Sequence, residues 1–376
     1  MNSRIPEDLI ERAHRGKTTK EDALLLLEVP PFELFRFADE LRDLAAGDTV
    51  TYVVNRNINF TSRCTGTCGF CAFRTDDGKV LSIEEIMEKV REAEKANATE
   101  VCIQGGLLPD VGLDFYQGIV EAIKAEFPEM HVHSFSPMEV YHASRISEIP
   151  VKESLRRLKR SGLDTMPGTA AEILSDRVRK IICPAKLNTA EWIEVVTQAH
   201  AAGIPTTATM MYGHVETPEE RINHMLTIRE IQKETGGITE FVPLPFMPYN
   251  NPVGEKMIKE GRYATPGLED LKVYAVSRIL FHGHVDNIQA SWVKLGKKFA
   301  QFSLHCGVND LGGTLMEESI SRSAGACHGE MITVDELEWM IHGAGRIPKE
   351  RTTLYREAHE LASRNSRKIA GCGAFE

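Results

Sequence analysis

Short apolar, β-rich runs alternate along most of the chain with segments in which apolar residues recur at helical spacing. From Thr51 onward eight such runs can be counted, and each ends in a polar or glycine-containing cluster. They span residues 51–60, 100–104, 131–135, 165–166 with its flanks, 206–212, 239–243, 286–291 and 305–308. Repeated alternation of strand and helix requires a parallel sheet with helical crossovers. Eight units over about 260 residues therefore predict an α/β fold, a closed (βα)8 barrel of TIM type.

Capping signals mark where several of the intervening helices begin. Ser82-Ile83-Glu84-Glu85 is a capping box ahead of a one-sided apolar pattern, and Thr217-Pro218-Glu219-Glu220 adds a proline at the first helical position. Before the first strand, residues 1–50 predict two or three short helices that form a cap or lid. The barrel is predicted to span residues 51–332. Residues 333–376 are predicted to form a helical extension packed outside it.

The composition is that of a soluble globular protein rather than a disordered or membrane-spanning one. Hydrophobic residues make up 42% of the chain and charged residues 26%, and no apolar run reaches the roughly 18 residues that a membrane span requires. Lys and Arg total 44 against 54 Asp and Glu, so no basic field is available to bind nucleic acid. Residues 1–30 carry no export signal, and we expect a cytoplasmic protein that binds neither nucleic acid nor membranes.

Three of the eight cysteines, Cys64, Cys68 and Cys71, fall within eight residues directly after the first predicted strand. In a large cytosolic chain such a cluster indicates metal binding or redox chemistry rather than a disulfide framework. Gly66 and Gly69 allow the backbone to wrap around one object. Soft thiolates select zinc or an iron–sulfur cluster, and structural zinc needs a fourth ligand that the nearby sequence lacks. A 4Fe–4S cluster held by three thiolates is favoured, because it leaves one iron open to a small molecule.

A zinc hydrolase is the alternative from a different class of function. His131 and His133 on one predicted strand, with His214 and Asp310 at later strand ends, form a ligand set that such an enzyme could use. This alternative leaves the three clustered cysteines unexplained. A non-catalytic iron–sulfur electron carrier is a third class, but it would not need a full barrel whose strands all end in polar residues.

The spacing Cys64-x3-Cys68-x2-Cys71, with Phe70 before the third cysteine, resembles the signature of radical S-adenosylmethionine (SAM) enzymes. In that family the open iron of a 4Fe–4S cluster chelates the amino and carboxylate groups of SAM, and the aromatic residue packs near the adenine. The resemblance implies a radical SAM barrel with both cofactors bound at this loop.

Three further strand ends carry candidate ligand residues. Gln104-Gly105-Gly106 resembles the family's Gly-Gly-Glu motif, which binds the SAM amino group, although the glutamate is missing here; the plainer alternative is a tight turn that needs glycine. Glu139 and Glu172 lie in mostly uncharged stretches, where a carboxylate can accept hydrogen bonds from hydroxyl or ammonium groups. We assign Glu172 to SAM and Glu139 to the substrate, with an N-terminal helix carboxylate as the alternative for Glu172.

Longer stretches of the chain resemble one small group within this superfamily. The stretches are 68–73, 103–107, 207–214 and 309–314, and the group comprises the deazaflavin (FO) synthase subunits, aminofutalosine synthase and dehypoxanthine futalosine cyclase. Residues 136–140, 166–174 and 241–246 look most like the FO synthase subunit that consumes tyrosine. The two menaquinone-pathway activities are the alternative. Leu108, where the group usually has histidine, is a departure from the pattern.

This resemblance implies a transferase of coenzyme F(420) biosynthesis. The reaction joins the 4-hydroxybenzyl group of L-tyrosine to 5-amino-6-(D-ribitylamino)uracil and releases 2-iminoacetate, methionine and 5′-deoxyadenosine. It further implies a low-potential electron donor and hand-off of the product to the companion FO synthase subunit.

Side chains at the later strand ends offer groups for these two substrates. Phe246 and Trp292 would supply aromatic contacts. Arg322 or Lys294 could bind a carboxylate, although solvated surface charge is the plainer interpretation of both cations. The remaining candidates, which offer polar edges, are His214, Asn287, Gln289 and Asn309. We expect the closed barrel and its N-terminal cap to exclude water from the radical chemistry.

Overall fold

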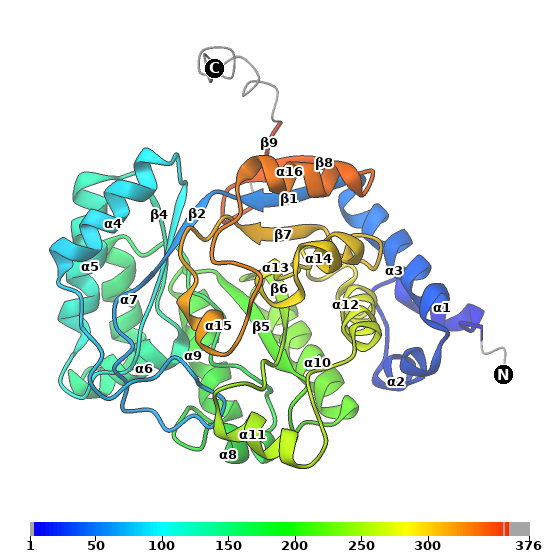
Figure 1. Cartoon of the computed structure of the whole chain (residues 1–376), viewed down its shortest axis with the longest axis horizontal. Helices are drawn as coiled ribbons and strands as arrows, with labels where there is room; N and C mark the ends of the chain where they lie inside the picture. The colour runs from blue at the N-terminus through cyan, green and yellow to red at the C-terminus, as the bar shows by residue number, and fades with distance from the viewer. Residues whose placement is uncertain (1–3, 356–357, 361–376) are drawn as a thin grey trace, which may run out of the picture.

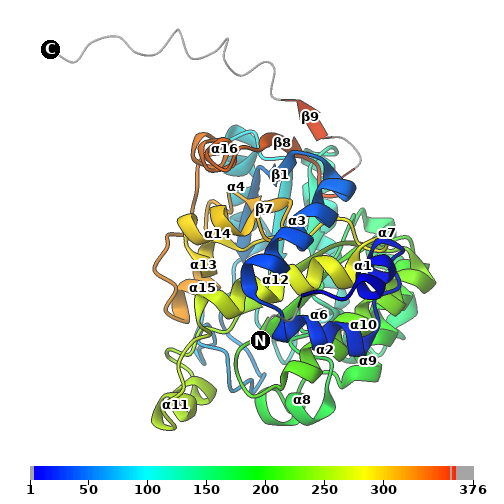
Figure 2. The same ribbon diagram turned by 90° about the vertical axis from the view of Figure 1, so that its right-hand side faces the viewer.

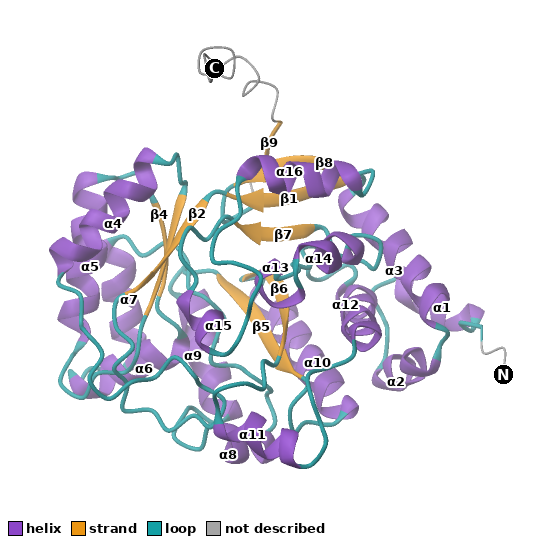
Figure 3. Ribbon diagram, in the orientation of Figure 1, coloured by secondary structure: helices purple, strands orange, loops and turns teal. Residues whose placement is uncertain are grey.

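Parallel strands enclosed by helices form the centre of the molecule (Figures 1 and 3). The computed structural model describes residues 4–355 and 358–360. The strands are β1 (Thr49–Val53), β2 (Asn55–Asn59), β3 (Glu100–Gln104), β4 (His131–Ser134), β5 (Thr206–Tyr212), β6 (Ile238–Pro245), β7 (Asp310–Gly313), β8 (Ile347–Arg351) and β9 (Ala358–Glu360). The helices are α1 (Glu7–His14), α2 (Lys20–Glu28), α3 (Pro31–Ala46), α4 (Ile83–Lys95), α5 (Leu113–Glu126), α6 (Pro137–Ile146), α7 (Val151–Ser161), α8 (Asp176–Ile182), α9 (Thr189–Ala201), α10 (Pro218–Thr235), α11 (Pro252–Lys259), α12 (Gly267–Phe281), α13 (Trp292–Leu295), α14 (Lys297–Ser303), α15 (Ser319–Ser323) and α16 (Val334–Gly343).

The strands follow one another in the order expected for a barrel. Regular pairing gives three sheets, β7-β1-β8-β9, β2-β3-β4 and β5-β6, in which every pair is parallel except β8 with β9. Single parallel bridges connect the sheets: His133 to Thr165, Met166 to Thr206, Phe241 to Ile288 and Gln289 to Asp310. β1 and β2 are consecutive in the chain and occupy one position of a ring. The other seven positions are β3, β4, residues 165–166, β5, β6, residues 288–289 and β7, and the two given by residue numbers are bridges rather than full strands.

Two of the predicted strands differ in detail from the structure. The run 51–60 divides at Val54 into β1, which pairs with β7 and β8, and β2, which pairs with β3. The strand predicted at 305–308 is wrong, because these residues turn after α14: His305 N donates to Phe302 O, and Gly307 has a φ of +96°. The strand at this position of the ring is β7, which begins two residues later.

The three N-terminal helices lie on the side of the barrel. Figure 2 shows α3 crossing α12, with α2 beside α10. Polar contacts hold them there: Thr18 Oγ1 donates to Ile279 O at 3.2 Å, and Lys272 Nζ donates to Leu27 O at 2.6 Å. None of the described residues before Thr49 lines the interior cavity. Helices are thus present where the sequence predicts them, and they pack on the side of the barrel without lining the cavity.

Part of the predicted C-terminal extension, residues 356–357 and 361–376, lies outside the described residues. The helix expected after Thr333 is present as α16, which begins at the predicted capping box. β8 then adds to the edge of β1, a strand that the sequence did not predict. At the end of β8 the Arg351 guanidinium donates to Asp310 Oδ2 at 2.6 Å and to Glu240 Oε2 at 3.1 Å. Arg351 and Thr353 therefore border the barrel interior.

Removing the Arg351 charge is expected to destabilise the fold strongly. In Arg351→Met, the carboxylates of Asp310 and Glu240 stay buried without their cation, which costs about 3–5 kcal/mol of unfolding free energy. Equilibrium urea unfolding measures this loss. Lys349→Met, on the same strand, is the control and should change stability by less than about 0.5 kcal/mol. An equal effect of the two substitutions would contradict the role given to the buried cation.

None of the helices in the described ranges combines the length and apolar character needed to cross a bilayer.

A candidate active site at the carboxyl ends of the barrel strands

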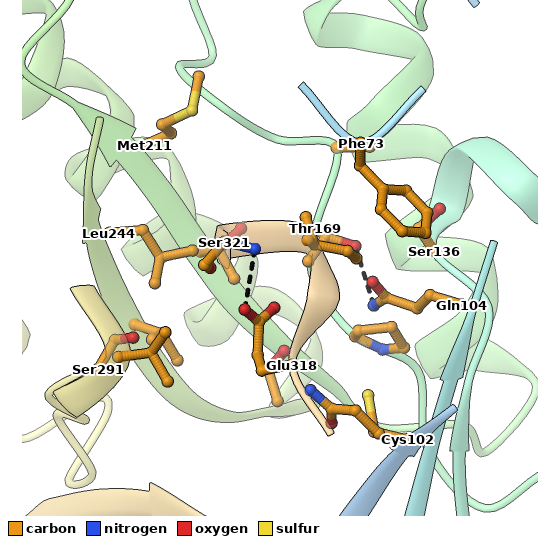
Figure 4. A pocket seen from close by; sticks show the side chains of 18 of the residues that line it. Phe73, Cys102, Gln104, Ser136, Thr169, Met211, Leu244, Ser291, Glu318 and Ser321 are labelled. Atoms are coloured by element: carbon orange, nitrogen blue, oxygen red, sulfur yellow. Dashed lines mark hydrogen bonds between the residues drawn. The ribbon is translucent and has the colours of Figure 1, made fainter. Parts of the chain in front are cut away.

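Inward-facing side chains and strand ends surround one cavity of about 460 Å³. The loop that carries the clustered cysteines borders it, and residues from β3, β5, β6 and β7 form its walls. Figure 4 shows Gln104, Thr169 and Glu318 directed into this space from different elements. Its position agrees with the rule that barrel enzymes bind ligands at the carboxyl ends of their strands.

The cysteine loop follows β2 and is fixed to three neighbouring segments. Gly69 N donates to Ile182 O at 2.7 Å, and Val253 N donates to Gly69 O at 2.9 Å. On the other side, Thr65 N donates to Leu107 O at 2.9 Å. These backbone bonds hold a loop that has little secondary structure of its own in one conformation at the border of the cavity.

The three thiols suit an iron–sulfur cluster. Cys64, Cys68 and Cys71 are free and partly exposed, and all three border the cavity. The backbone N–H groups of Gly66 and Leu107 each point at Cys64 Sγ at 3.2 Å, an arrangement that stabilises a thiolate. Burial raises the pKa of Cys68, which favours the thiol form, and binding of a metal would displace this proton. Within the described residues, no three His, Cys, Asp or Glu side chains are close enough together to coordinate a single metal ion.

The loop after β3 packs closely against the cysteine loop, and its two glycines make this possible. A Cβ at Gly106 would lie 2.1 Å from Arg63 O and 2.8 Å from Cys64 Cβ, and one at Gly105 would lie 2.5 Å from the Phe60 ring. Gly106 N also donates to Thr61 O at 3.0 Å. The glycines are thus required for contact between two loops, besides any role in binding a ligand.

We expect Gly106→Ala to impair cluster binding, because the added methyl group overlaps backbone that positions Cys64. Overpacking of this kind costs about 1–3 kcal/mol, and here the strain falls on the cysteine loop. Iron content after anaerobic reconstitution should fall several-fold. Gly118→Ala, where the added carbon meets only the end of the Ile83 side chain, is the control and should load normally. Normal iron content in Gly106→Ala would contradict the prediction, because it would show that the cysteine loop accommodates the added methyl group.

Glu139 supports the same loop. Its Oε1 accepts the Gly105 N–H at 2.9 Å, and its Oε2 accepts the backbone N–H and the hydroxyl of Ser136 at 2.7 and 2.6 Å. Burial raises the pKa of Glu139 to about 7, although these three bonds act in the opposite direction. Glu139 borders the cavity as predicted for a substrate ligand, but its oxygens already hold α6 and the glycine loop in place.

Glu172 forms an ion pair beside the cysteine loop. Lys186 Nζ lies 2.7 Å from Glu172 Oε1 and 5.1 Å from the centre of the Phe70 ring. Burial acts to raise the pKa of Glu172, but the Lys186 ammonium outweighs it and the pKa is lowered. Glu172 therefore stays ionised next to Phe70 and Cys68. It is not part of a helix, since α8 begins later, and its φ of +46° points to a loop held in place by its contacts.

Deeper in the cavity, the structure places four of the predicted side chains together. Phe246 and Trp292 are buried and line the wall, and Trp292 Nε1 donates to Gly313 O at 3.0 Å. Gln289 and Lys294 also line it. With its amide oriented to satisfy its neighbours, Gln289 donates to both oxygens of Glu240 at 3.1 Å.

Four predicted substrate residues, His214, Asn287, Asn309 and Arg322, do not line this cavity, and we do not propose them as substrate contacts. His214 is buried against Glu216, with 2.9 Å between Nδ1 and Oε2. Asn287 and Asn309 hydrogen-bond one another at 3.2 Å below the cavity and support the strand ends. Arg322 is exposed and pairs with Glu330, as the surface-charge interpretation expects. Only His214 follows a regular strand; Asn287 and Asn309 come just before the bridge at Ile288 and the start of β7, and Arg322 lies in α15.

The ligand set predicted for a zinc hydrolase is also not assembled. His131 Nε2 and His133 Nδ1 both face Thr165 Oγ1, at 2.8 and 2.7 Å. His214 belongs to the Glu216 pair, and Asp310 is paired with Arg351.

Sequence reasoning missed several charged residues of the cavity, among them Lys186, Glu240 and Glu318. Glu240 lies within the predicted sixth strand at an inward position, which alternation along the strand could have revealed. Lys186 and Glu318 come from loops with no periodic pattern, so only the tertiary structure shows that they face the cavity.

Comparisons with known proteins agree with this site. Residues 58–228 match the model of the radical SAM superfamily, and residues 235–363 match the CofH/MqnC C-terminal region. A 5-amino-6-(D-ribitylamino)uracil--L-tyrosine 4-hydroxyphenyl transferase of Methanosarcina acetivorans is 91% identical over the full length of both chains. A protein of that name from Methanothermobacter thermautotrophicus is 52% identical over 94% of this chain and 98% of its own.

Solved structures agree with the fold. Methylornithine synthase (PylB) superposes with a TM-score of 0.71 at 17% identity, over 90% of this chain and 97% of its own. HydG, a maturase of the FeFe-hydrogenase, gives a TM-score of 0.71 at 18% identity, over 93% and 76% of the two chains. Together with the cysteine loop and the cavity, the full-length relatives decide the family: the chain belongs to the radical SAM superfamily, in the group that carries the CofH/MqnC C-terminal region.

Proposed function

We propose that this protein joins the 4-hydroxybenzyl group of L-tyrosine to 5-amino-6-(D-ribitylamino)uracil, a step in coenzyme F(420) biosynthesis. The observation that carries the proposal is the 91% identity, over the full length of both chains, to a relative named for this transfer. The structure supports it with one cavity that has an apolar wall, several polar groups and a border formed by the cysteine loop. This mixture suits an aromatic amino acid and a flat heterocycle with a polyol chain.

Cys64, Cys68 and Cys71 would hold the 4Fe–4S cluster, and the remaining iron would bind SAM. When reduced, this pair of cofactors supplies a 5′-deoxyadenosyl radical. The proposed SAM contacts are Phe70, Gln104, Gly105, Gly106 and Glu172. Support comes from the ionised Glu172 beside the half-buried Phe70, since a carboxylate accepts hydrogen bonds from ribose hydroxyls or an ammonium group.

The role of the chain is to place the reactants and to exclude water. Loss of a hydrogen atom from tyrosine leads to scission of its Cα–Cβ bond, which yields 2-iminoacetate and a 4-hydroxybenzyl radical. That radical forms a bond to the uracil ring, and the adduct would then lose one proton and one electron, with the cluster that was oxidised in SAM cleavage as the electron acceptor. Walls of buried side chains around the cavity keep such species away from solvent.

The proposal includes partners and a location. A low-potential electron donor must reduce the cluster, and the companion FO synthase subunit would take the product. Seven cysteines in the described part of the chain are free thiols, which fits the reducing conditions of the cytoplasm.

An anaerobic assay of the reconstituted protein tests the substrate assignment. Tyrosine with the ribitylaminouracil is compared with the substrates of aminofutalosine synthase and of the futalosine cyclase, and products are followed by mass spectrometry. We expect an adduct that carries the hydroxybenzyl group only when tyrosine, the uracil, SAM and reductant are all present. Glyoxylate, from hydrolysis of 2-iminoacetate, should form in step with it.

Conversion of a futalosine-type substrate without any hydroxybenzyl adduct would overturn the proposal in favour of the menaquinone pathway. Ring-labelled tyrosine provides the control, because the label must appear in the adduct and not in glyoxylate.

A further inference from the structure

Two oppositely charged side chains face the cavity without an ion-pair partner. Lys294 lies on α13, and Glu318 precedes α15 as its N-cap residue. Both line the cavity, and Figure 4 shows Glu318 projecting into it. No hydrogen bond or ion pair joins the Lys294 ammonium to any other residue in the part of the chain that the structure describes, and Glu318 likewise has no cation within 4.0 Å there.

The protein itself satisfies these two charges only in part. Glu318 Oε2 accepts the Ser321 N–H at 2.8 Å, and the backbone N–H of Arg322 also faces this carboxylate. Lys294 interacts with Glu318 and Glu172 only at longer range. The surrounding wall includes Trp292, Leu244 and Ile320, so neither charge is well solvated. Burying unpaired charges is costly, and a ligand with complementary charges would offset that cost.

We propose that Lys294 and Glu318 bind the α-carboxylate and the α-ammonium group of the amino acid substrate. Lys294 would pair with the carboxylate and Glu318 with the ammonium, so that one zwitterion neutralises both side chains. This inference rests on the proposed function, in which tyrosine is that amino acid. The ribitylaminouracil carries no comparable pair of charges and would occupy another part of the cavity.

The pKa shifts of Lys294 and Glu318 agree with a site that a charged ligand completes. Burial lowers the pKa of Lys294, with Glu318 acting against this shift, and burial raises the pKa of Glu318, with Lys294 acting against it. Each charged form is thus penalised in the free protein. A bound zwitterion would favour the charged form of both.

Equilibrium binding to the reconstituted protein tests the proposal with three ligands. Tyrosine carries both charged groups, tyramine lacks the carboxylate, and 3-(4-hydroxyphenyl)propionate lacks the amine. In Lys294→Met, affinity for tyrosine and for the propionate should fall about 10- to 100-fold while tyramine is unaffected. In Glu318→Gln, affinity for tyrosine and for tyramine should fall and that for the propionate should not.

Matched controls separate a local effect from a general one. Lys298→Met and Glu317→Gln change neighbouring residues outside the cavity, and neither should alter affinity for any of the three ligands. Iron content and the circular dichroism spectrum show whether each variant is folded. SAM also carries an α-amino acid group, so its affinity is measured as well, and it should stay unchanged if the pair binds the substrate.

Three outcomes would overturn the inference. Equal losses for all three ligands would indicate a merely structural role, and unchanged tyrosine affinity in both variants would exclude any role in binding. Loss of SAM affinity instead of tyrosine affinity would assign the pair to SAM. If the wild-type protein binds no tyrosine and converts a futalosine-type substrate, the proposed function fails, a result distinguishable from failure of this pair alone.

Discussion

Replacing Cys64, Cys68 and Cys71 together by alanine is expected to remove essentially all iron and inorganic sulfide from the reconstituted protein. Three thiolates at this spacing should hold about four irons and four sulfides, with one iron left free of protein ligands. The three sulfurs belong to one loop and border the cavity, together with Gly106 and Glu172. Iron analysis, sulfide analysis and visible absorbance measure the loss, and SAM cleavage should disappear with it.

Cys327→Ser provides the matched control, because Cys327 is an exposed thiol that does not line the cavity. It should bind iron as the unmodified protein does. If anaerobic reconstitution of the unmodified chain gave one zinc ion and no iron, the cluster assignment would be wrong. Retention of SAM cleavage in the triple variant would contradict it equally.

The barrel could be predicted because most of its strands are short apolar runs that read clearly in the sequence. β3 and β5 were predicted with the bounds that the structure shows. The prediction failed at β7, whose sequence Asp310-Leu311-Gly312-Gly313 has the composition of a turn. Its extended conformation is imposed by pairing with β1, a contact between residues about 260 positions apart that no local pattern encodes.

The same division between local and distant information applies to the site. The cysteine spacing and the glycine pair are local motifs, and the structure places both at the border of the cavity. Side-chain direction at the later strand ends was not predictable, since a shift of one residue reverses the face of a strand. Asn309 and Gln289 illustrate this. Both were predicted as polar substrate contacts, but only Gln289 lines the cavity, whereas Asn309 accepts a hydrogen bond from Arg278.

Phenylalanine should be a far poorer substrate than tyrosine, by a factor on the order of 10⁴ in product formation. Sites built to bind a hydroxyl group reject an analogue that lacks it, because buried polar groups are then left without a partner. Polar side chains share this cavity with its apolar wall; they include Asn57, His133 and Thr209. Scission of the Cα–Cβ bond is also easier when the departing benzyl radical carries the para oxygen. Both effects act in the same direction.

The comparison requires binding and turnover to be measured separately. Phenylalanine has the same α-amino and α-carboxylate groups as tyrosine, so the pair formed by Lys294 and Glu318 should still hold it. We therefore expect its affinity to fall much less than its rate of product formation. Mass spectrometry of the uracil adduct and of 5′-deoxyadenosine measures the rate, and equilibrium dialysis measures affinity. Comparable yields of a benzyl adduct from phenylalanine would show that the para oxygen is required neither for recognition nor for bond scission.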